Sequence, residues 1–342
     1  MIRTSQRPSP SIVGLSDVVV DVYLRVNRLP GLGEKVQATF MGRMAGGTVP
    51  NAMCAASRLG ARTYLVGRAG DDDHGALATD DLRRFGVDTS HVRTVPGSAT
   101  AWTVVVLTPS GERVIYLVSD ACSPDGDTPE CRDAGLRRPQ GITAIEEEDL
   151  TLIRQSDALY LSPHVGREAL SQALAAAKAG GTLVAVDLEQ AALEYLENPW
   201  QIMASCDVVF LNDEACSWLA SCTGVSPGEV LARVARLGPS FVVNTKGPRG
   251  ALVLACDQEI MSPGFKVPVV DTTGAGDCFN AAFLCAVLWG WDAGTALRFA
   301  NAAGALAVTA VGPRGNLPTL QQVLEFMRGG NCAEVPGECS AG

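Results

Sequence analysis

The sequence predicts an α/β protein with a mostly parallel central sheet and a second, smaller β-sheet. Along most of the chain, short runs rich in Val, Ile and Leu alternate with longer segments of helical spacing. This alternation is typical of a parallel sheet covered by helices on both faces. Two stretches, 23–44 and 101–118, interrupt it with β-rich runs separated by Gly and Pro turns. We expect these stretches to form antiparallel strands of a separate sheet.

The elements of the main sheet follow one another along the chain. The β-rich run 12–22 comes first, with Asp21 at its end, and helical spacing follows at 49–59. Strands are expected at 63–66, 158–161, 183–186, 208–211 and 241–244, with a hairpin partner at 251–255. Helical or apolar segments accompany them at 75–85, 168–179, 213–220, 230–237 and 280–288. We expect one domain, 11–328, with flexible tails at 1–10 and 329–342 and a long loop at 119–141.

The two interrupting stretches predict a small lid that stands off the main domain. Runs 103–107 and 114–118 flank the turn Pro109-Ser110-Gly111 as the strands of a hairpin do. In the first stretch, Pro30-Gly31 marks the turn between two strands. The lid is expected to comprise about 22–45 and 101–118.

Composition and charge exclude several classes of function. The net charge of −10 argues against a nucleic acid partner, which requires a basic surface. Asp17 and Asp21 interrupt the first apolar run, and no uncharged run is long enough to span a bilayer, so we expect neither a signal peptide nor a membrane partner. The 11 cysteines lack the paired short spacings of a zinc site, and we expect reduced thiols in a cytoplasmic protein.

The segment 271–279 predicts an anion site at a helix N-terminus. Its sequence, Asp-Thr-Thr-Gly-Ala-Gly-Asp-Cys-Phe, turns through glycines and leads into the apolar segment 280–288. Backbone N–H groups in the first turn of a helix lack intrahelical partners and lie at the positive end of the helix dipole, so they can hold an anion. Asp277 stands at the mouth of this site, where its carboxylate could take a proton from a hydroxyl that attacks a phosphate. The alternative is an Asp that only caps the helix.

Two further positions predict contacts with a hydroxylated ligand. Gly46 and Gly47 precede a helix expected to begin near Asn51. Two glycines let the backbone approach a ligand closely, and the Asn51 amide can both donate to and accept from hydroxyls. Asp21 follows a buried apolar run, and the ends of such strands face the crevice where open α/β sheets bind ligands. The structural alternatives are a Gly-rich turn with an Asn cap, and an ordinary acid at a strand end.

Five motifs in chain order resemble those of the ribokinase (PfkB) family of carbohydrate kinases. They are Gly46-Gly47-x-x-x-Asn51, Gly67-x-x-Gly70-Asp71-Asp72-x-x-Gly75, Gly111-Glu112-Arg113, Thr245-Lys246-Gly247-x-x-Gly250 and Asp271-Thr272-Thr273-Gly274-Ala275-Gly276-Asp277. The resemblance extends from about Ile12 to Met327. It implies a ribokinase-like, Rossmann-type α/β sandwich with a β-sheet lid, and ATP-dependent phosphorylation of a sugar hydroxyl.

The resemblance also implies a role for each matching residue. Asp277 would be the general base, and the amides of Gly274, Ala275 and Gly276 would form the anion hole for the γ-phosphate. The sugar would be bound by Asp21, Gly46, Gly47 and Asn51. The nucleotide would be bound by Asn212, Thr245, Gly247, Gly250 and Asn301. A monovalent-cation loop, occupied by potassium, would comprise Asp271, Thr273, Ala307, Ala310, Gly312 and Asn316. Magnesium is implied by the nucleotide, because phosphoryl oxygens need their charge screened during transfer.

Two departures from the family pattern bear on the sugar and on magnesium. Val19 stands where ribokinases proper carry an Asn against the sugar, which argues against ribose. The family's Asn-x-x-Glu motif is one residue short here, because the sequence is Asn212-Asp213-Glu214. Either Glu214 or Asp213 would then take the magnesium-organising role.

Alternatives to a simple sugar kinase remain open. The acceptor could be a nucleoside, with Trp102 and Tyr23 as the only aromatic candidates to stack on a base. It could also be a phosphosugar, with Arg25, Arg43 or Lys35 as the basic residues. From another class, the chain could be a non-catalytic, sugar-binding regulatory protein. A lid with free strand edges could in addition serve as a homodimer surface.

Overall fold

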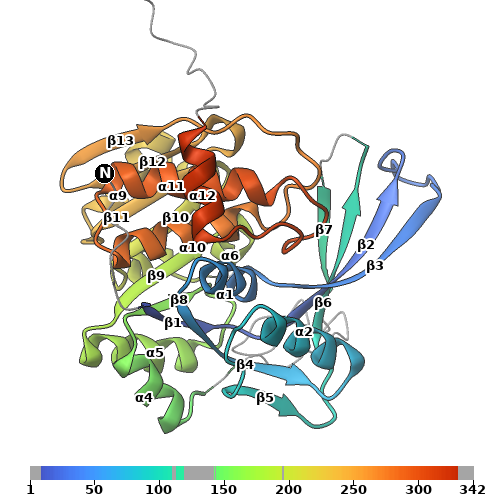
Figure 1. Cartoon of the computed structure of the whole chain (residues 1–342), viewed down its shortest axis with the longest axis horizontal. Helices are drawn as coiled ribbons and strands as arrows, with labels where there is room; N and C mark the ends of the chain where they lie inside the picture. Colours follow the sequence, from blue (N-terminus) through green and yellow to red (C-terminus); the bar gives the residue numbers. More distant parts are fainter. Residues whose placement is uncertain (1–8, 110–112, 119–141, 143, 195, 330–342) are drawn as a thin grey trace, which may run out of the picture.

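The computed structural model describes residues 9–109, 113–118, 142, 144–194 and 196–329, and it contains two sheets (Figure 1). The larger sheet has nine strands in the order β13-β12-β11-β10-β9-β8-β1-β4-β5. These are β1 (Ser11–Leu15), β4 (Arg62–Gly70), β5 (Val92–Val95), β8 (Ala158–Leu161), β9 (Leu183–Leu188), β10 (Val208–Asn212), β11 (Phe241–Thr245), β12 (Ala251–Ala255) and β13 (Gln258–Ser262). Neighbouring strands from β11 to β5 run parallel, and β12 and β13 add an antiparallel edge. The predicted α/β fold is confirmed.

Helices cover both faces of this sheet. One face carries α1 (Thr48–Arg58), α2 (Asp73–Arg84), α10 (Ala275–Leu288), α11 (Ala293–Ala307) and α12 (Leu320–Arg328). The other carries α4 (Glu147–Gln155), α5 (Arg167–Gly180), α6 (Gln190–Leu193), α7 (Pro199–Met203), α8 (Asp213–Thr223) and α9 (Pro227–Ala235). Successive strand residues point to opposite faces, so Ile12 lies in the first core and Val13 in the second. Strands buried on both faces explain the continuous apolar runs of the sequence.

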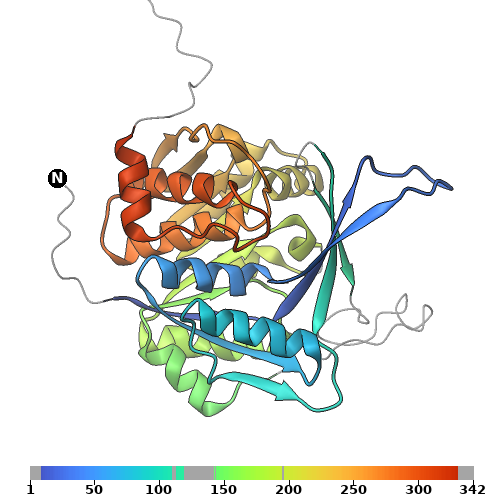
Figure 2. The same cartoon turned by 45° about the vertical axis from the view of Figure 1, so that its right-hand side comes forward.

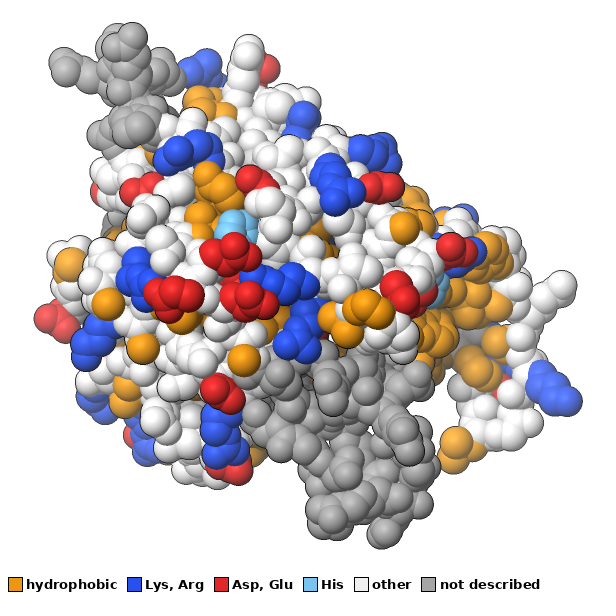
Figure 3. Space-filling view, turned by 90° about the horizontal axis from the view of Figure 1, so that it is seen from below, with side chains coloured by type: hydrophobic (Ala, Val, Ile, Leu, Met, Phe, Trp, Pro, Cys, Tyr) orange, Lys and Arg blue, Asp and Glu red, His pale blue; other side chains and the backbone are white. Residues whose placement is uncertain are grey.

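The smaller sheet stands off one side of the main domain (Figure 2) and has the order β3-β2-β6-β7. Its strands are β2 (Val19–Val26), β3 (Ala38–Gly46), β6 (Ala101–Leu107) and β7 (Arg113–Val118). The hairpins β2–β3 and β6–β7 are antiparallel, as predicted, but β2 and β6 join them through a parallel pair. On the face of the molecule shown in Figure 3, hydrophobic side chains gather at the side that carries this sheet.

One strand boundary differs from the prediction. The β-rich run 12–22 is not a single strand: β1 belongs to the main sheet and β2 to the small one. Asp21 therefore lies inside β2 rather than at the end of the first strand. The crossing occurs at 16–18, where Ser16 and Val18 still donate to backbone oxygens of β4 before the chain leaves the main sheet. The polar pair Ser16-Asp17, which interrupts the apolar run at this point, is the sequence signal that could have indicated the crossing.

Other local differences are small. Helix α1 begins at Thr48 instead of near Asn51, with Gly47 at its N-cap position. Pro50 is tolerated there because the first N–H groups of a helix have no intrahelical partner. The elements β5, α4, α6, α7, β13, α11 and α12 were not predicted. The predicted tails lie largely, and the 119–141 loop entirely, outside the described residues.

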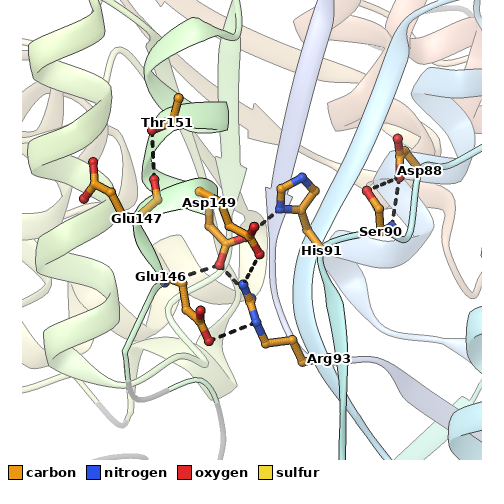
Figure 4. Close-up of polar contacts among 9 residues, drawn as sticks. Asp88, Ser90, His91, Arg93, Glu146, Glu147, Asp149 and Thr151 are labelled. Carbon is orange, nitrogen blue, oxygen red and sulfur yellow. Dashed lines mark hydrogen bonds and ion pairs between the residues drawn. The ribbon is translucent and has the colours of Figure 1, made fainter.

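A charged cluster fastens the edge strand β5 to helix α4 (Figure 4). The fully buried carboxylate of Asp149 accepts from His91 Nδ1 and from Arg93 Nη1, both at 2.6 Å. Arg93 also contacts Glu146 and Glu148 at 3.2 and 2.8 Å. A metal ion at His91, Glu148 and Asp149 would have to displace the Arg93 guanidinium, so we assign this cluster to holding the sheet edge.

The structure also addresses the cysteine and membrane predictions. The seven cysteines among the described residues carry free thiols, and five of them are buried. No helix in the described ranges has both the length and the apolar character to cross a membrane.

Candidate active site

The carboxyl group of Asp277 is buried in the first turn of α10. Gly274 precedes the helix with φ 77°, and no side chain caps this N-terminus. Asp277 does not act as the cap: its Oδ2 accepts a hydrogen bond of 2.7 Å from Asn51 Nδ2, and the residue is 7% exposed. The acid and the open end of the helix are therefore neighbours, as the loop sequence predicted.

The surroundings of Asp277 favour its protonated form. The pKa of Asp277 is raised to about 8, chiefly by burial and also by the negative charge of Glu189. The hydrogen bond from Asn51 and the positive charge of Arg113 oppose this effect. A carboxyl with a pKa close to neutral pH is suited to general base catalysis, since it can accept and release a proton under working conditions.

The predicted sugar-binding residues come together next to Asp277. Asp21, from the small sheet, is 6% exposed and accepts 2.6 Å from the Thr103 hydroxyl. A Cβ atom on Gly46 would lie 2.1 Å from Asp21 Oδ2, so a larger residue at that position would displace the Asp21 carboxyl. Gly47 has φ 89°, and its oxygen accepts from Asn51 N at 2.9 Å. Burial raises the pKa of Asp21 as well.

Arg314, which was not predicted, connects these residues. Its guanidinium donates to Asn51 Oδ1 at 2.9 Å through Nε, and to Gly46 O at 3.0 Å through Nη2. Its Nη1 pairs with Asp81 of α2 at 2.7 Å. Arg314 lies in the loop 312–315, which comes after α11 in the chain, and the residue is 8% exposed. The Gly-Pro-Arg-Gly sequence of this loop predicts a turn, but nothing in it indicates the contact with Asn51.

Two acids at the end of β9 complete the site and were also missed. Carboxylate oxygens of Asp187, Glu189 and Asp277 lie within 4.8 Å of one another. Asp187 accepts from Tyr160 Oη at 3.1 Å and from Asn280 Nδ2 at 2.9 Å. Its pKa is raised well above the ordinary range, chiefly by burial and also by the charge of Glu189. An acid directly after the apolar run 183–186 was the sequence signal that could have found Asp187.

Arg113 connects the small sheet to the glycine loop. It begins β7 and donates to the hydroxyl of Thr272, which precedes the predicted anion hole. Its positive charge partly offsets the rise that burial causes in the pKa of Asp277, Asp21 and Glu189. A cation from the small sheet thus reaches the acids of the main domain.

The predicted cation loop folds around the Asp271 carboxylate. This fully buried group accepts from Thr273 N at 2.9 Å, Thr273 Oγ1 at 2.7 Å and Gly312 N at 2.9 Å. Asn316 Nδ2 donates to Leu306 O at 3.0 Å and to Thr309 Oγ1 at 2.8 Å, which leaves its Oδ1 as an acceptor. Ala307 ends α11, and Ala310 lies in the turn that follows.

The predicted nucleotide-binding residues lie along the ends of β10 and β11. Asn212 and Thr245 are cross-strand partners at these ends. Gly247 has φ 57°, and a Cβ on Gly250 would lie 2.1 Å from Ser262 O. Asn301 donates to that same Ser262 oxygen at 3.0 Å, which places it next to the turn. The predicted nucleotide-binding residues therefore lie near one another in space, and their contacts also hold the local strand ends and turns in place.

The two acids of the shortened motif, Asp213 and Glu214, lie in different surroundings. Asp213 pairs with Lys246 at 3.4 Å and with Arg249, so its charge is neutralised. Glu214 is exposed, and its charge raises the pKa of Glu189. Of the two acids, Glu214 is the one whose charge acts on the acidic group beside Asp277.

Comparison with known proteins defines the class of this protein. Residues 9–320 match the pfkB family carbohydrate kinase model, so the chain belongs to this family and is a sugar kinase. Ribokinase from Bacillus subtilis is 30% identical over 308 residues, covering 90% of this chain and 96% of that protein. An ATP-dependent ribose-1-phosphate kinase from Halopiger xanaduensis is 31% identical over 307 residues, covering 90% and 94%. The structure of Arabidopsis thaliana ribokinase complexed with ribose and ATP superposes with a TM-score of 0.75 at 27% identity, covering 94% of this chain and 99% of that one. The predicted family and fold are confirmed.

Proposed function

We propose that this kinase transfers the γ-phosphate of ATP to a hydroxyl of a sugar, with Asp277 as the general base. The observation that carries the proposal is the buried Asp277 carboxyl beside the uncapped N-terminus of α10. Asp277 would take the proton of the attacking hydroxyl, and the amides of Gly274, Ala275 and Gly276 would stabilise the charge of the transferring phosphoryl group. Relatives that are ribokinases support the same chemistry.

The sugar would be held between the two sheets. Asp21 and Asn51 offer hydrogen-bonding groups, and Gly46 and Gly47 permit close approach of the ring. The small sheet would act as a lid that excludes water, which would otherwise compete for the phosphoryl group. The proposed lid would comprise the strands 19–26, 38–46, 101–107 and 113–118.

The nucleotide would lie along the ends of β10 and β11. Its predicted contacts are Asn212, Thr245, Gly247, Gly250 and Asn301. Magnesium would supply charge neutralisation for the phosphoryl oxygens. Glu189 and Glu214 would hold it, because the negative charge of Glu214 raises the pKa of Glu189 and a bound cation would relieve that repulsion.

Potassium would occupy the loop around Asp271. The side chain of Asp271 already accepts three hydrogen bonds from Thr273 and Gly312, which leaves the loop carbonyls and Asn316 Oδ1 as further oxygen ligands for a monovalent cation. A cation there would stiffen the loop next to Gly274. Activity in potassium compared with the same concentration of a tetramethylammonium salt tests this assignment.

A phosphosugar acceptor is the second candidate. Arg113 lies near Asp21 and Asp277, where it could pair with a substrate phosphate, and one relative is a ribose-1-phosphate kinase. Arg43 fits less well, since it pairs with Val22 and so lies on the sheet face opposite to Asp21. The nucleoside alternative gains no such support, because Tyr23 is fully buried and the Trp102 ring packs against His74 at 6.4 Å.

One assay separates these functions. ATP consumption is followed in a coupled assay over a panel of free sugars, sugar phosphates and nucleosides. Turnover that requires a free sugar supports the first proposal, and turnover with sugar phosphates alone supports the second. Sugar binding without turnover would instead indicate the regulatory protein.

The small sheet is also the proposed homodimer surface. Among the described strands, β3 and β7 lie at the two edges of this sheet, and Phe40 and Tyr116 are 62% and 57% exposed on the face away from Asp21. Light scattering of the wild type and of Phe40→Ser tests whether two copies of the chain pair through this face.

ATP as a substrate and free thiols among the described cysteines favour a cytoplasmic location.

A further inference from the structure

Arg314 lies between the glycine loop that precedes α10 and the sugar-binding residues Gly46 and Asn51. Its loop contacts the main domain's glycine loop, because Pro313 O lies 2.5 Å from where a Cβ on Gly274 would stand. The side chain extends the other way, to Asn51 and to the backbone oxygen of Gly46. Within the described residues, all three nitrogens of the guanidinium have partners, so Arg314 is not a free cation for a substrate phosphate.

The contact with Asn51 determines which way its amide faces. A side-chain amide can be turned over at little cost unless its partners distinguish oxygen from nitrogen. Arg314 can only donate, so the atom of Asn51 that faces it must be the oxygen. The NH₂ group must then face Asp277, which it reaches at 2.7 Å.

We infer that Arg314 is a positioning residue, which orients the Asn51 amide so that it donates to the general base. The inference rests on the proposed function, since it assigns a role to a neighbour of the same site. A turned amide would direct its oxygen at Asp277, where two acceptors would repel each other and the ionised base would lose a hydrogen bond. Arg314 thus acts on the reaction through Asn51, without contact with the reacting atoms.

The test is the pH profile of kcat/KM for the sugar in wild type and in Arg314→Leu. The acid limb, the low-pH side of the profile on which kcat/KM rises with pH, reports the pKa of the base in the free enzyme. We expect this limb to move to higher pH by about one unit, the effect of one hydrogen bond to a charged group. The KM for the sugar should rise, because Gly46 and Asn51 lose their support, while the KM for ATP should stay within about twofold.

The other charged groups around Asp277 are unchanged by the substitution. They are Asp187 at the end of β9, Glu189 directly after β9, Asp21 from β2 and Arg113 from β7. A matched control is Asp81→Asn, which removes the ion pair of Arg314 but leaves its bonds to Asn51 and Gly46. That variant should lose stability without moving the acid limb.

A double-mutant cycle separates positioning from general damage. In an Asn51→Ala background there is no amide to orient, so Arg314→Leu should move the acid limb no further. If Arg314→Leu does not fold, Arg314→Met replaces it, because the methionine side chain fills similar space but offers no N–H donor to Asn51 Oδ1 and should also move the limb.

The outcomes for the positioning role of Arg314 and for the proposed function can be told apart. An acid limb that stays in place in a folded Arg314 variant, or that moves equally in the Asn51→Ala background, overturns the inference and leaves the proposed function standing. A wild type without turnover on any sugar or sugar phosphate overturns the proposed function, and the inference with it.

Discussion

Replacing Asp277 with Asn should abolish most activity while making the protein more stable. The variant keeps the shape of the side chain, and its amide oxygen can accept the same hydrogen bond from Asn51 Nδ2. The group that takes the proton is gone, so kcat should fall by roughly 10² to 10⁴. The KM for ATP should change little, because the amides at the start of α10 are untouched.

The stability gain follows from the cost of a buried charge. Burial raises the pKa of Asp277 from an ordinary 3.8 to about 8. Each pKa unit corresponds to about 1.4 kcal/mol, so ionising this group costs the folded state on the order of 5 kcal/mol at pH 8 and above. The wild type therefore loses stability relative to Asp277→Asn as the pH rises from about 4 to about 8, and the two differ little below this range.

Two measurements check this prediction together. A coupled ATPase assay with sugar gives kcat, and urea unfolding at several pH values gives the free energy of unfolding. Asp149→Asn is the control, since it also alters a fully buried carboxyl but lies in the cluster between β5 and α4. Near-full turnover by Asp277→Asn would refute the role of base. A stability difference that does not grow with pH would refute the raised pKa.

Three further predictions test the glycines and the remote cluster. Gly46→Ala should raise the KM for the sugar at least about tenfold in steady-state assays, because its Cβ would lie 2.1 Å from Asp21. An unchanged KM would place the sugar elsewhere. Gly274→Ala should lower kcat strongly, since φ 77° and a backbone oxygen 2.5 Å away both exclude a Cβ; normal kcat would remove the anion hole from this loop. Asp149→Asn should cost about 1–3 kcal/mol in urea unfolding with kcat unchanged, because it weakens only the bonds to Arg93 and His91. A loss of kcat there would show that the cluster affects the site.

Much of the fold was predictable because its elements carry local signals. Strand β8 was placed at its observed bounds, and the glycines before α10 marked a turn into a helix. Edge elements were missed where these signals are weak: β5 has four residues, none fully buried. The crossing between β1 and β2 was missed because the apolar residues on either side of Ser16-Asp17 were assigned to one strand, although they belong to different sheets.

The sequence by itself determined the alternation of strands and helices, the glycine loop with its acid at Asp277, and a set of motifs sufficient to place the chain among the carbohydrate kinases. These features depend on residue spacing and on turn chemistry, which act over a few positions. Only the tertiary structure decided that Arg314 orients toward Asn51, 263 residues away, and that Asp187 and Glu189 surround the base. Hydrogen bonds and raised pKa values of this kind arise from burial and from contacts between distant segments, and the order of residues along the chain does not record them.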